Sequence, residues 1–469
     1  MPNLQTALFY LEQRKIMPEI KYIYIVSLGC SKNFVDTEIM AAELIQNGFG
    51  LTSEKSKANI CLINTCAFIP PARTEAESNI LECIKWKKSR NGFRKIIVTG
   101  CLTQWDKKNQ YSSKYPEVDL WLGIEEIPSL PQKLLGLYDR NNGKSSSSKV
   151  TCNYSPKYLY DETTPRIILS SSSHAFIKIA DGCDNRCSYC SIPSIRGNLR
   201  SRTIISVVKE AENIIKTGVR EIILIAQDIT AFSRDIKNSN ENLAKLLKEL
   251  DKIEGNYWIR LHYLHPEGIT DELIETLKTS RHIIAYLDIP LQHISDPILK
   301  AMNRKIGKNY ILEVLEKIRQ IKAMTIRTTF LVGFPGETQE NFEELLEFVR
   351  KSNFERIGVF PFYPEPGTKA AAMKNIVPSD VAKERAEIIQ KVHTEKSLKF
   401  NSNLVGNIFD VILDSVNNKF AIGRTYMDSP DIDNTVIVEY SKKPNLKPGE
   451  IIRVKIESFS AFELKGILI

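Results

Sequence analysis

Three short apolar runs in the first part of the chain each end in a cysteine, and this repetition constrains the fold most. The runs are YIYIVSLGC, ANICLINTC and RKIIVTGC, which end at Cys30, Cys66 and Cys101. Isoleucine and valine dominate them, as in the buried strands of parallel sheets. At least the first two lead into helical patterns, and the first of these helices is predicted to stop at Gly48. We therefore predict an α/β domain over residues 21–137, with βα units on a parallel sheet.

The middle of the chain alternates between strands and helices again. Residues 138–168 are rich in Ser, Asn and Pro without a sustained period, so we predict a linker there. Over residues 169–400 the alternation predicts a second α/β domain, a parallel sheet that is open or partly closed like a (β/α)6 barrel. Its active residues should lie at the carboxyl ends of its strands. The predicted strands are AFIKIAD, EIILIAQDI, WIRLHYLH, IAYLDIPLQ, TIRTTFLVGF and ERIGVFPFY.

The last part, residues 401–469, changes to short strands without helices. Five strands separated by Gly, Pro and Asn turns predict a small all-β barrel of the OB kind. This part carries 8 Lys and Arg against 9 Asp and Glu, so its net charge is −1 and that of the remainder is +9. A barrel that grips phosphate backbones should be basic, because phosphate neutralisation drives such binding.

The composition indicates a reduced, globular protein. Nine cysteines among 469 residues are too few for a disulfide scaffold, and their odd count and clustering favour metal ligation. The first 20 residues lack a signal-peptide pattern and no run approaches about 18 apolar residues, so we expect a cytoplasmic location and no membrane span. The net charge of +8 suits a nucleic-acid or ribosomal partner but is also common among ordinary enzymes.

A second cysteine group lies in the segment IADGCDNRCSYCSIP. Cys183, Cys187 and Cys190 follow the strand AFIKIAD with the spacing C-x3-C-x2-C, so three thiolates can converge in one loop. A structural zinc site would need a fourth ligand, and the nearest upstream histidine, His174, is at the other end of that strand. A [4Fe-4S] cluster held by three cysteines keeps one iron open for another molecule. The missing fourth ligand is then the active position.

This loop after the first strand of an α/β barrel resembles the radical S-adenosylmethionine (SAM) superfamily. The resemblance implies that the open iron binds SAM through its amino and carboxylate groups. An electron from the cluster then cleaves SAM to a 5′-deoxyadenosyl radical.

Cys30, Cys66 and Cys101 are too far apart in the sequence for a loop motif, but parallel strand ends meet at one edge of a sheet. Three thiols there can hold a second cluster, and the alternative is three unrelated buried cysteines. The segments SLGCSKNFVDTE, INTCAFIPPA and VTGCLTQ, with the radical motif and the terminal barrel, are similar to the methylthiotransferase family. That family has an amino-terminal domain, a radical SAM core and a TRAM barrel. The resemblance implies two [4Fe-4S] clusters and two molecules of SAM, one as radical source and one as methyl donor.

Polar residues at other strand ends are further candidates. Gln227 in AQDI, Gln292 in DIPLQH and Gly333 in LVGFPGET are predicted to contact the cofactor, although a plain βα turn also explains the glycine. His293 is equally well explained as a loop histidine with satisfied hydrogen bonds. We name no general acid or base. Three cysteines do not end a strand and are predicted not to be ligands: Cys61, Cys83 and Cys152.

The family acts on two substrates, an adenosine of transfer RNA (MiaB type) or an aspartate of the twelfth small-subunit ribosomal protein (RimO type). The segments LHYLHPEGITDELI and GRTYMDSPDIDNTVIVEY resemble the ribosomal-protein type. An acidic loop with Asp428, Asp431 and Asp433 would attract a basic ribosomal protein, and its alternative is a solvated turn. The resemblance implies methylthiolation of the aspartate β-carbon, with a flavodoxin or ferredoxin as electron donor. A third hypothesis is an iron–sulfur carrier without catalysis, although a carrier has no need of so large a barrel.

Overall fold

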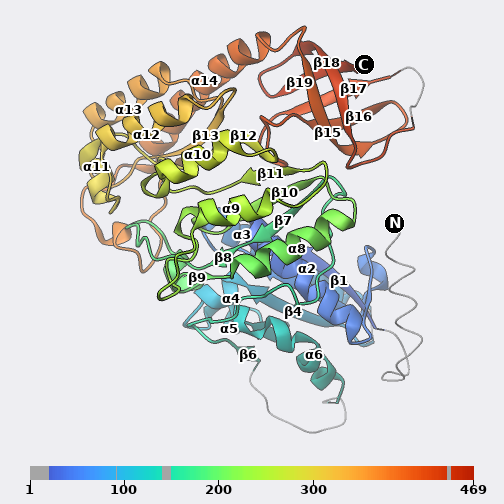
Figure 1. Ribbon diagram of the computed structural model, residues 1–469. Helices are drawn as coiled ribbons and strands as arrows, with labels where there is room; N and C mark the ends of the chain where they lie inside the picture. Colours follow the sequence, from blue (N-terminus) through green and yellow to red (C-terminus); the bar gives the residue numbers. More distant parts are fainter. Residues whose placement is uncertain (1–20, 91, 140–148, 441–444) are drawn as a thin grey trace. The chain divides into compact units, whose positions relative to one another are not determined.

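The structure is a computed structural model that describes residues 21–90, 92–139, 149–440 and 445–469 (Figure 1). The first 20 residues and residues 140–148 of the predicted linker lie outside these ranges. The chain divides into two compact units. The first contains Met1–Leu169 and Ser191–Asn198, and the second contains Ser170–Cys190 and Leu199–Ile469.

The first unit is built on six parallel strands in the order β2-β1-β3-β4-β5-β6. All six side chains of β3 are buried, so its continuous apolar sequence is that of a central strand covered on both faces. The three strands predicted before the cysteines are confirmed, and β6 shows that part of the predicted linker joins this sheet. The elements are β1 (Tyr22–Ser27), α2 (Ser31–Gln46), β2 (Gly50–Leu51), β3 (Ile60–Thr65), α3 (Pro70–Lys88), β4 (Lys95–Gly100), α4 (Cys101–Trp105), α5 (Gln110–Lys114), β5 (Leu120–Leu122), α6 (Leu130–Asp139), β6 (Val150–Thr151) and α7 (Ile192–Ile195).

The core of the second unit is an open sheet of six parallel strands in the order β14-β13-β12-β11-β10-β7. All six predicted core strands are therefore confirmed, and the helices between them make the parallel crossovers. Helix α13 begins with a capping box in which Thr338 and Asn341 satisfy each other's backbone groups. The elements are β7 (His174–Lys178), β8 (Ala180–Asp181), β9 (Arg200–Ser201), α8 (Ile204–Lys216), β10 (Glu221–Ile225), α9 (Leu243–Leu250), β11 (Trp258–Leu261), α10 (Asp271–Thr279), β12 (Ile283–Asp288), α11 (Asp296–Ala301), α12 (Lys308–Arg319), β13 (Thr325–Val332), α13 (Gln339–Lys351) and β14 (Arg356–Pro361).

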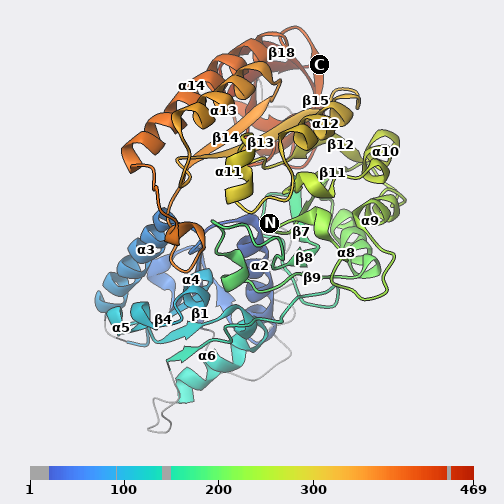
Figure 2. The ribbon, with the colours of Figure 1, turned by 90° about the vertical axis from the view of Figure 1, so that its left-hand side faces the viewer.

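A long helix, α14 (Ser379–Ser402), leads from this core into a small barrel in the same unit. It lies beside α13 and β14 (Figures 1 and 2). The barrel is closed, with strand order β15-β16-β17-β19-β18, and it confirms the five predicted strands. Its interior is apolar and includes Val411, Val436 and Leu464. The strands are β15 (Ile408–Val416), β16 (Phe420–Arg424), β17 (Thr435–Glu439), β18 (Ile451–Phe459) and β19 (Glu463–Leu468).

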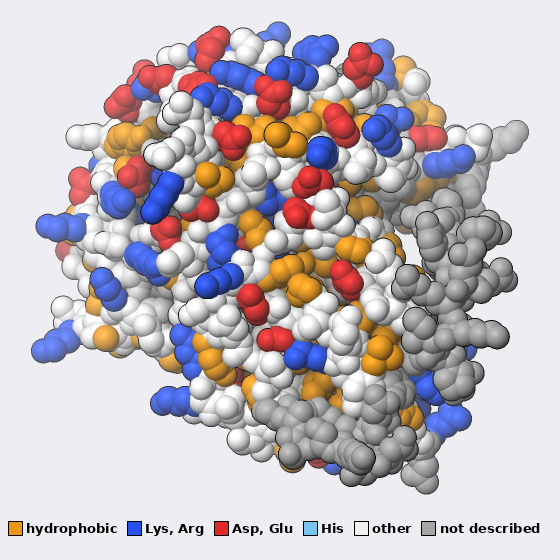
Figure 3. Space-filling model, turned by 60° about the horizontal axis from the view of Figure 1, so that its bottom comes forward, with side chains coloured by type: hydrophobic (Ala, Val, Ile, Leu, Met, Phe, Trp, Pro, Cys, Tyr) orange, Lys and Arg blue, Asp and Glu red, His pale blue; other side chains and the backbone are white. Residues whose placement is uncertain are grey.

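Within the described ranges, no helix has the length and apolar content needed to cross a bilayer. On the face drawn in Figure 3, basic and acidic side chains are interspersed. On that face, the charged residues behind the net charge of +8 do not form a patch of one sign.

Candidate cluster and cofactor sites

The carboxyl ends of three neighbouring strands carry the first cysteine group. Strand β1 pairs with β3, which pairs with β4, and all three are parallel. Cys30 follows the end of β1 by three residues, and Cys66 and Cys101 directly follow β3 and β4. The sheet thus brings together three residues that are far apart in the sequence, at the edge where parallel sheets bind their ligands.

Two glycines make room for this arrangement. Gly29 has φ +90°, and a Cβ built on it would lie 2.6 Å from the Cβ of Cys66. Gly100 has φ +91°, and a Cβ there would lie 2.3 Å from Asn64 Oδ1. A side chain at either position would meet both a strained backbone and a clash. The close approach of Gly29 packs the Cys30 turn against Cys66.

The three thiols of this group differ in acidity. Cys30 caps the amino end of α2, and although desolvation opposes ionisation, the charges of Lys32 and Arg196 hold its pKa below the usual value. Burial raises the pKa of Cys66, and it raises the pKa of Cys101 to about 12. The negative charge of other thiolates in the group also raises the pKa of Cys66 and Cys101, as expected for sulfurs that share a site. Metal binding here would release protons.

The chemistry of this donor set suits a cluster better than a single ion. Among the described residues, no three Cys, His, Asp or Glu side chains are close enough together to hold one metal ion. A four-iron cluster spreads its ligands over different irons, so its cysteines are farther apart than the ligands of one ion. Three strand-end sulfurs without a histidine or carboxylate among them match thiolate ligation of iron–sulfur clusters. The group therefore fits a [4Fe-4S] cluster.

The second cysteine group lies in a loop of the second unit that follows β8. Gly182 and Arg186 adopt left-handed backbone conformations, with φ +78° and +54°, which curl the loop. The Cys190 amide donates to the Cys187 carbonyl at 3.1 Å. Cys183 feels the charge of Cys187, and burial raises its pKa to about 11. The loop thus gathers its thiols, and it fits a cluster with three cysteine ligands.

Neighbouring segments of the core hold this loop in place. The Ser188 amide donates to the Met302 carbonyl at 3.0 Å, and the Ala370 amide donates to the Ser188 carbonyl at 2.8 Å. The ring of Tyr189 packs edge-on against Phe334 with centroids 6.5 Å apart. Phe334 belongs to the LVGFPGET segment, so this contact brings the predicted glycine motif beside the cysteine loop.

Polar side chains at the ends of the first core strands form a hydrogen-bonded set. Gln227 Nε2 donates to Asp181 Oδ1 at 2.7 Å, and Lys178 Nζ lies 3.2 Å from Asp181 Oδ2. Asn185, inside the cysteine loop, donates to Asp228 Oδ2 at 2.8 Å. The predicted cofactor contact Gln227 therefore lies beside the loop. Asp181 and Lys178 complete the set. The sequence alone did not identify them, because each has the pattern of an ordinary strand residue.

The other predicted contacts follow β12 and β13 of the core sheet. Gln292 has φ +70° and forms a bridge with Phe330. Gly333 has φ +74°, and a Cβ there would lie 2.3 Å from the Cβ of Ala382, so the approach of α14 alone requires glycine. His293 is fully buried and accepts from the Ser295 amide at 3.0 Å, and burial lowers its pKa to about 3. This is a neutral loop histidine with one satisfied nitrogen.

Two of the three remaining cysteines lie inside an element, but the third directly follows a strand, so the expectation that none of them ends a strand is wrong for Cys152. Cys61 is inside β3 and Cys83 is inside α3, and both are buried. Cys152 follows β6, with its Sγ 3.4 Å from Gln104 Oε1. Their predicted role as residues that do not bind metal stays a prediction.

The prediction of an exposed acidic loop on the terminal barrel is wrong for two of its three aspartates. The side chains of Asp428 and Asp433 are 0% and 3% exposed. Asp428 lies 2.5 Å from Arg356, and Asp433 lies 3.4 Å from Arg327 and accepts from Tyr286 at 2.7 Å. Isolated buried carboxylates are costly, so these pair with buried guanidinium groups of the core. Sequence alone did not reveal those partners, because they precede the aspartates by more than 70 residues.

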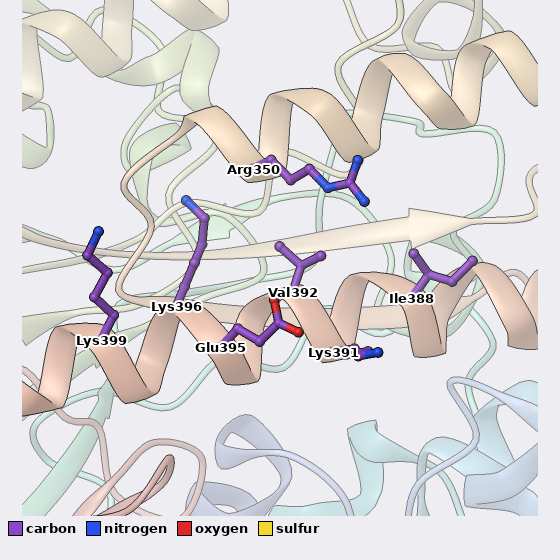
Figure 4. Close-up of a pocket in the computed structure, with 7 residues that line it drawn as sticks. All are labelled: Arg350, Ile388, Lys391, Val392, Glu395, Lys396 and Lys399. Carbon is purple, nitrogen blue, oxygen red and sulfur yellow. The ribbon is translucent and has the colours of Figure 1, made fainter.

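A groove between α13 and α14 has a volume of about 610 Å³ (Figure 4). In Figure 4, Lys396 and Val392 of α14 point toward α13, which carries Arg350. Lys391 and Lys399 also line it. No cysteine or strand-end residue lines the groove among the described residues, so we do not place the chemistry there.

Comparisons with known proteins agree with this geometry. Family models match residues 22–123 (uncharacterized protein family UPF0004), 177–349 (radical SAM superfamily) and 405–469 (TRAM domain). The chain resembles a radical SAM methyltransferase, TsrM from Kitasatospora setae, at 14% identity and a TM-score of 0.53, over 75% of this chain and 74% of that one. It also resembles the cobalamin-dependent enzyme OxsB at 12% identity and a TM-score of 0.51, over 80% of this chain and 58% of that one. These two likenesses show the fold alone.

The fold, the cysteine loop and the family match over residues 177–349 define a radical SAM enzyme, a class whose three-cysteine loop holds a [4Fe-4S] cluster for SAM. Two relatives are named ribosomal protein uS12 methylthiotransferase RimO. One, from Syntrophotalea carbinolica, is 40% identical over 96% of this chain and 97% of its own length. The other, from Carboxydothermus hydrogenoformans, is 42% identical over 95% and 99%. The chain belongs to the RimO family of methylthiotransferases.

Proposed function

We propose that this protein methylthiolates the β-carbon of an aspartate in the small-subunit ribosomal protein uS12. The proposed reaction uses two molecules of SAM and two [4Fe-4S] clusters. The observation that carries it is the pair of cysteine groups, each with three thiols at the carboxyl edge of a parallel sheet. A radical SAM enzyme needs only one such group, so a second one supports a second cluster for sulfur.

Each group has its own assignment in this proposal. Cys183, Cys187 and Cys190 hold the cluster that binds SAM. A second cluster, which handles sulfur, is held by a set on the other unit: Cys30, Cys66 and Cys101. When bound, the radical-site cluster and SAM supply an electron and a carbon radical able to remove hydrogen from an unactivated carbon.

In this proposal, the chain's own residues bind and orient SAM. The hydrogen-bonded set of Gln227, Asp181 and Lys178 fixes polar groups beside the cysteine loop, where the amino and carboxylate groups of SAM need partners. Gln292 and Gly333 are the proposed contacts at the other strand ends. A radical must be kept from water and side reactions, so the positions of these groups matter more than their acidity.

The substrate assignment follows the named relatives, which share about 40% of residues over nearly the whole chain. The alternative, a transfer-RNA adenosine, is the named substrate of none of these relatives. We also propose a flavodoxin- or ferredoxin-type electron donor and a cytoplasmic location, where uS12 is made and assembled.

The test is reconstitution of the full chain with iron and sulfide without oxygen, followed by turnover with SAM. The substrates are a peptide from the aspartate loop of uS12 and intact small subunits, with transfer RNA as the comparison. We expect mass spectrometry to show the gain of one sulfur and one CH2 on the aspartate. The same gain on transfer RNA alone would contradict the substrate assignment, and SAM cleavage without any gain would contradict methylthiolation.

A further inference from the structure

One arginine of the first unit lies in the segment directly after the radical motif. Helix α7 follows Cys190 by two residues, and Arg196 caps its carboxyl end. The segment Ser191–Asn198 belongs to the first unit, although the cysteines just before it belong to the second. The side chain of Arg196 is only 2% exposed. A fully buried guanidinium must find several partners, because it carries five donors and a permanent charge.

The guanidinium contacts three different groups of the first unit. Its Nη1 donates to Asp36 Oδ2 at 2.7 Å. Its Nη2 lies 3.0 Å from Asn33 Oδ1 and 3.5 Å from the Sγ of Cys101. The last contact is a hydrogen bond from a cation to a cysteine sulfur, which is strongest when that sulfur is a thiolate.

Asn33 connects the same guanidinium to the turns that carry the other two cysteines. Its Nδ2 donates to the Leu28 carbonyl at 2.7 Å and to the Thr65 carbonyl at 3.3 Å. Leu28 precedes Cys30 by two residues, and Thr65 precedes Cys66. Arg196 therefore touches one strand-end cysteine directly and the backbone at the other two through one amide.

The charge of Arg196 is paired with the buried carboxylate of Asp36. Its field also reaches Cys30 and Cys66, and for both it favours the thiolate. A cluster held by three thiolates gains negative charge on reduction, so a buried positive charge beside it favours the reduced state. Hydrogen bonds to cluster sulfurs act in the same direction.

We propose that Arg196 is a positioning residue for the cluster of the first unit, and that it raises the reduction potential of that cluster. It does so through the hydrogen bond to Cys101 and through its buried charge. This inference rests on the proposed function, because it requires that Cys30, Cys66 and Cys101 hold a cluster. A merely structural arginine would stabilise the fold but leave the potential unchanged.

The test isolates one cluster in the full chain. A variant with Cys183, Cys187 and Cys190 all replaced by alanine retains only the proposed first-unit ligands. In that background we compare Arg196→Met, Arg196→Lys and Asp36→Asn by iron content and by redox titration followed by electron paramagnetic resonance. We expect a lower midpoint potential for Arg196→Met. The decrease should be smaller for Arg196→Lys, because lysine keeps the positive charge but lacks the several fixed N–H donors of a guanidinium. For Asp36→Asn we expect a higher midpoint potential.

A matched control is another buried arginine that pairs with an acidic residue of α2. Arg166 pairs with Glu38 of α2 at 2.5 Å and is 7% exposed, but no contact with a cysteine is described for it. Arg166→Met removes a buried arginine pair, and we expect the midpoint potential to stay unchanged. Equal potentials in Arg196→Met and the background, or equal shifts in both arginine variants, would overturn the proposal. Loss of iron in Arg196→Met but not in Arg196→Lys or Arg166→Met would support it, since the charge then retains the cluster.

The two proposals fail in different ways. If the alanine background with Arg196 intact binds no iron, the second cluster itself is absent and the proposed function is wrong. If it binds iron and the potential does not respond to residues 196 and 36, only the role of Arg196 is wrong.

Discussion

The two ends of the core sheet in the second unit differ in how deeply their distinctive groups are buried. Near the amino ends of the strands, Glu221 pairs with Arg260 at 2.5 Å and with Arg424 at 2.8 Å, and all three side chains are at most 1% exposed. At the carboxyl ends, the cysteine loop and Gln227 are only partly buried.

This comparison separates charges that stabilise the fold from groups that remain available for chemistry. The buried ions at the amino ends pair with one another and link the core to the terminal barrel, which supplies Asp414 and Arg424. The thiols of the cysteine loop at the carboxyl ends are only partly buried, and they suit a metal cluster. The predictions below test that separation.

The largest effect is expected at the carboxyl ends. Replacing Cys187 with alanine removes one of three predicted cluster ligands, so SAM cleavage should fall to the background of the protein without iron. The free energy of unfolding of the protein without iron should change little, because Cys187 is partly exposed. Anaerobic SAM cleavage and urea unfolding measure the two properties. Cleavage at the wild-type rate would remove Cys187 from the ligand set.

The largest change in stability is expected at the amino ends. Glu221→Gln leaves Arg260 and Arg424 buried without their shared carboxylate, which should cost about 3–5 kcal/mol of unfolding free energy. Urea unfolding gives the loss. Glu439→Gln, an exposed change on the terminal barrel, should cost less than about 0.5 kcal/mol and serves as the control. Equal losses would show that the buried network does not stabilise the unit.

The pH dependence of stability should also differ between the two ends. Although burial opposes ionisation, Arg260 and Arg424 hold the pKa of Glu221 at about 2, below its usual 4.5. Its contribution, about 3 kcal/mol, is therefore complete above pH 4.5 and is lost as the pH falls toward 2. Burial lowers the pKa of His293 from 6.5 to about 3, so its contribution begins to fall already below pH 6.5.

Two variants distinguish these windows in unfolding measurements from pH 7 to pH 3. His293→Asn keeps an acceptor for the Ser295 amide but does not titrate, so it should flatten the decline between pH 6.5 and 4.5. Glu221→Gln should flatten only the decline below pH 4.5. If His293→Asn flattened only the decline below pH 4.5, or if Glu221→Gln flattened the decline between pH 6.5 and 4.5, the two pKa directions would be wrong.

The smallest effect is expected at Asp431, the exposed member of the predicted acidic loop. Asp431→Asn should change neither stability, by more than about 0.5 kcal/mol, nor the KM for the uS12 peptide. Asp428→Asn, which leaves Arg356 buried without its carboxylate, should destabilise the protein by about 3–5 kcal/mol. A raised KM in Asp431→Asn alone would restore the idea of an acidic docking surface.

The sequence predicted the strands well because their signals are local. Apolar runs such as EIILI and ICLINT mark central strands wherever they occur, and the cysteines that follow them indicate the functional edge. The partners of buried charges were not predictable in this way. Asp428 and Arg356 are 72 residues apart, and nothing near either one shows that it is buried.

The same distinction explains which parts of the candidate sites were missed. Cys183, Cys187 and Cys190 were found from spacing alone. Arg196 was missed because an arginine after a cysteine loop reads as a surface residue until the fold places it beside Cys101.

The ion pairs between the core and the terminal barrel also have a consequence for synthesis. Arg327 and Arg356 are made about 70 to 110 residues before their partners Asp433 and Asp428. Until those later residues leave the ribosome, the nascent core carries guanidinium groups that cannot be buried at an acceptable cost. The core should therefore complete its folding only when the terminal barrel is made. A chain that ends before residue 414 should remain incompletely folded.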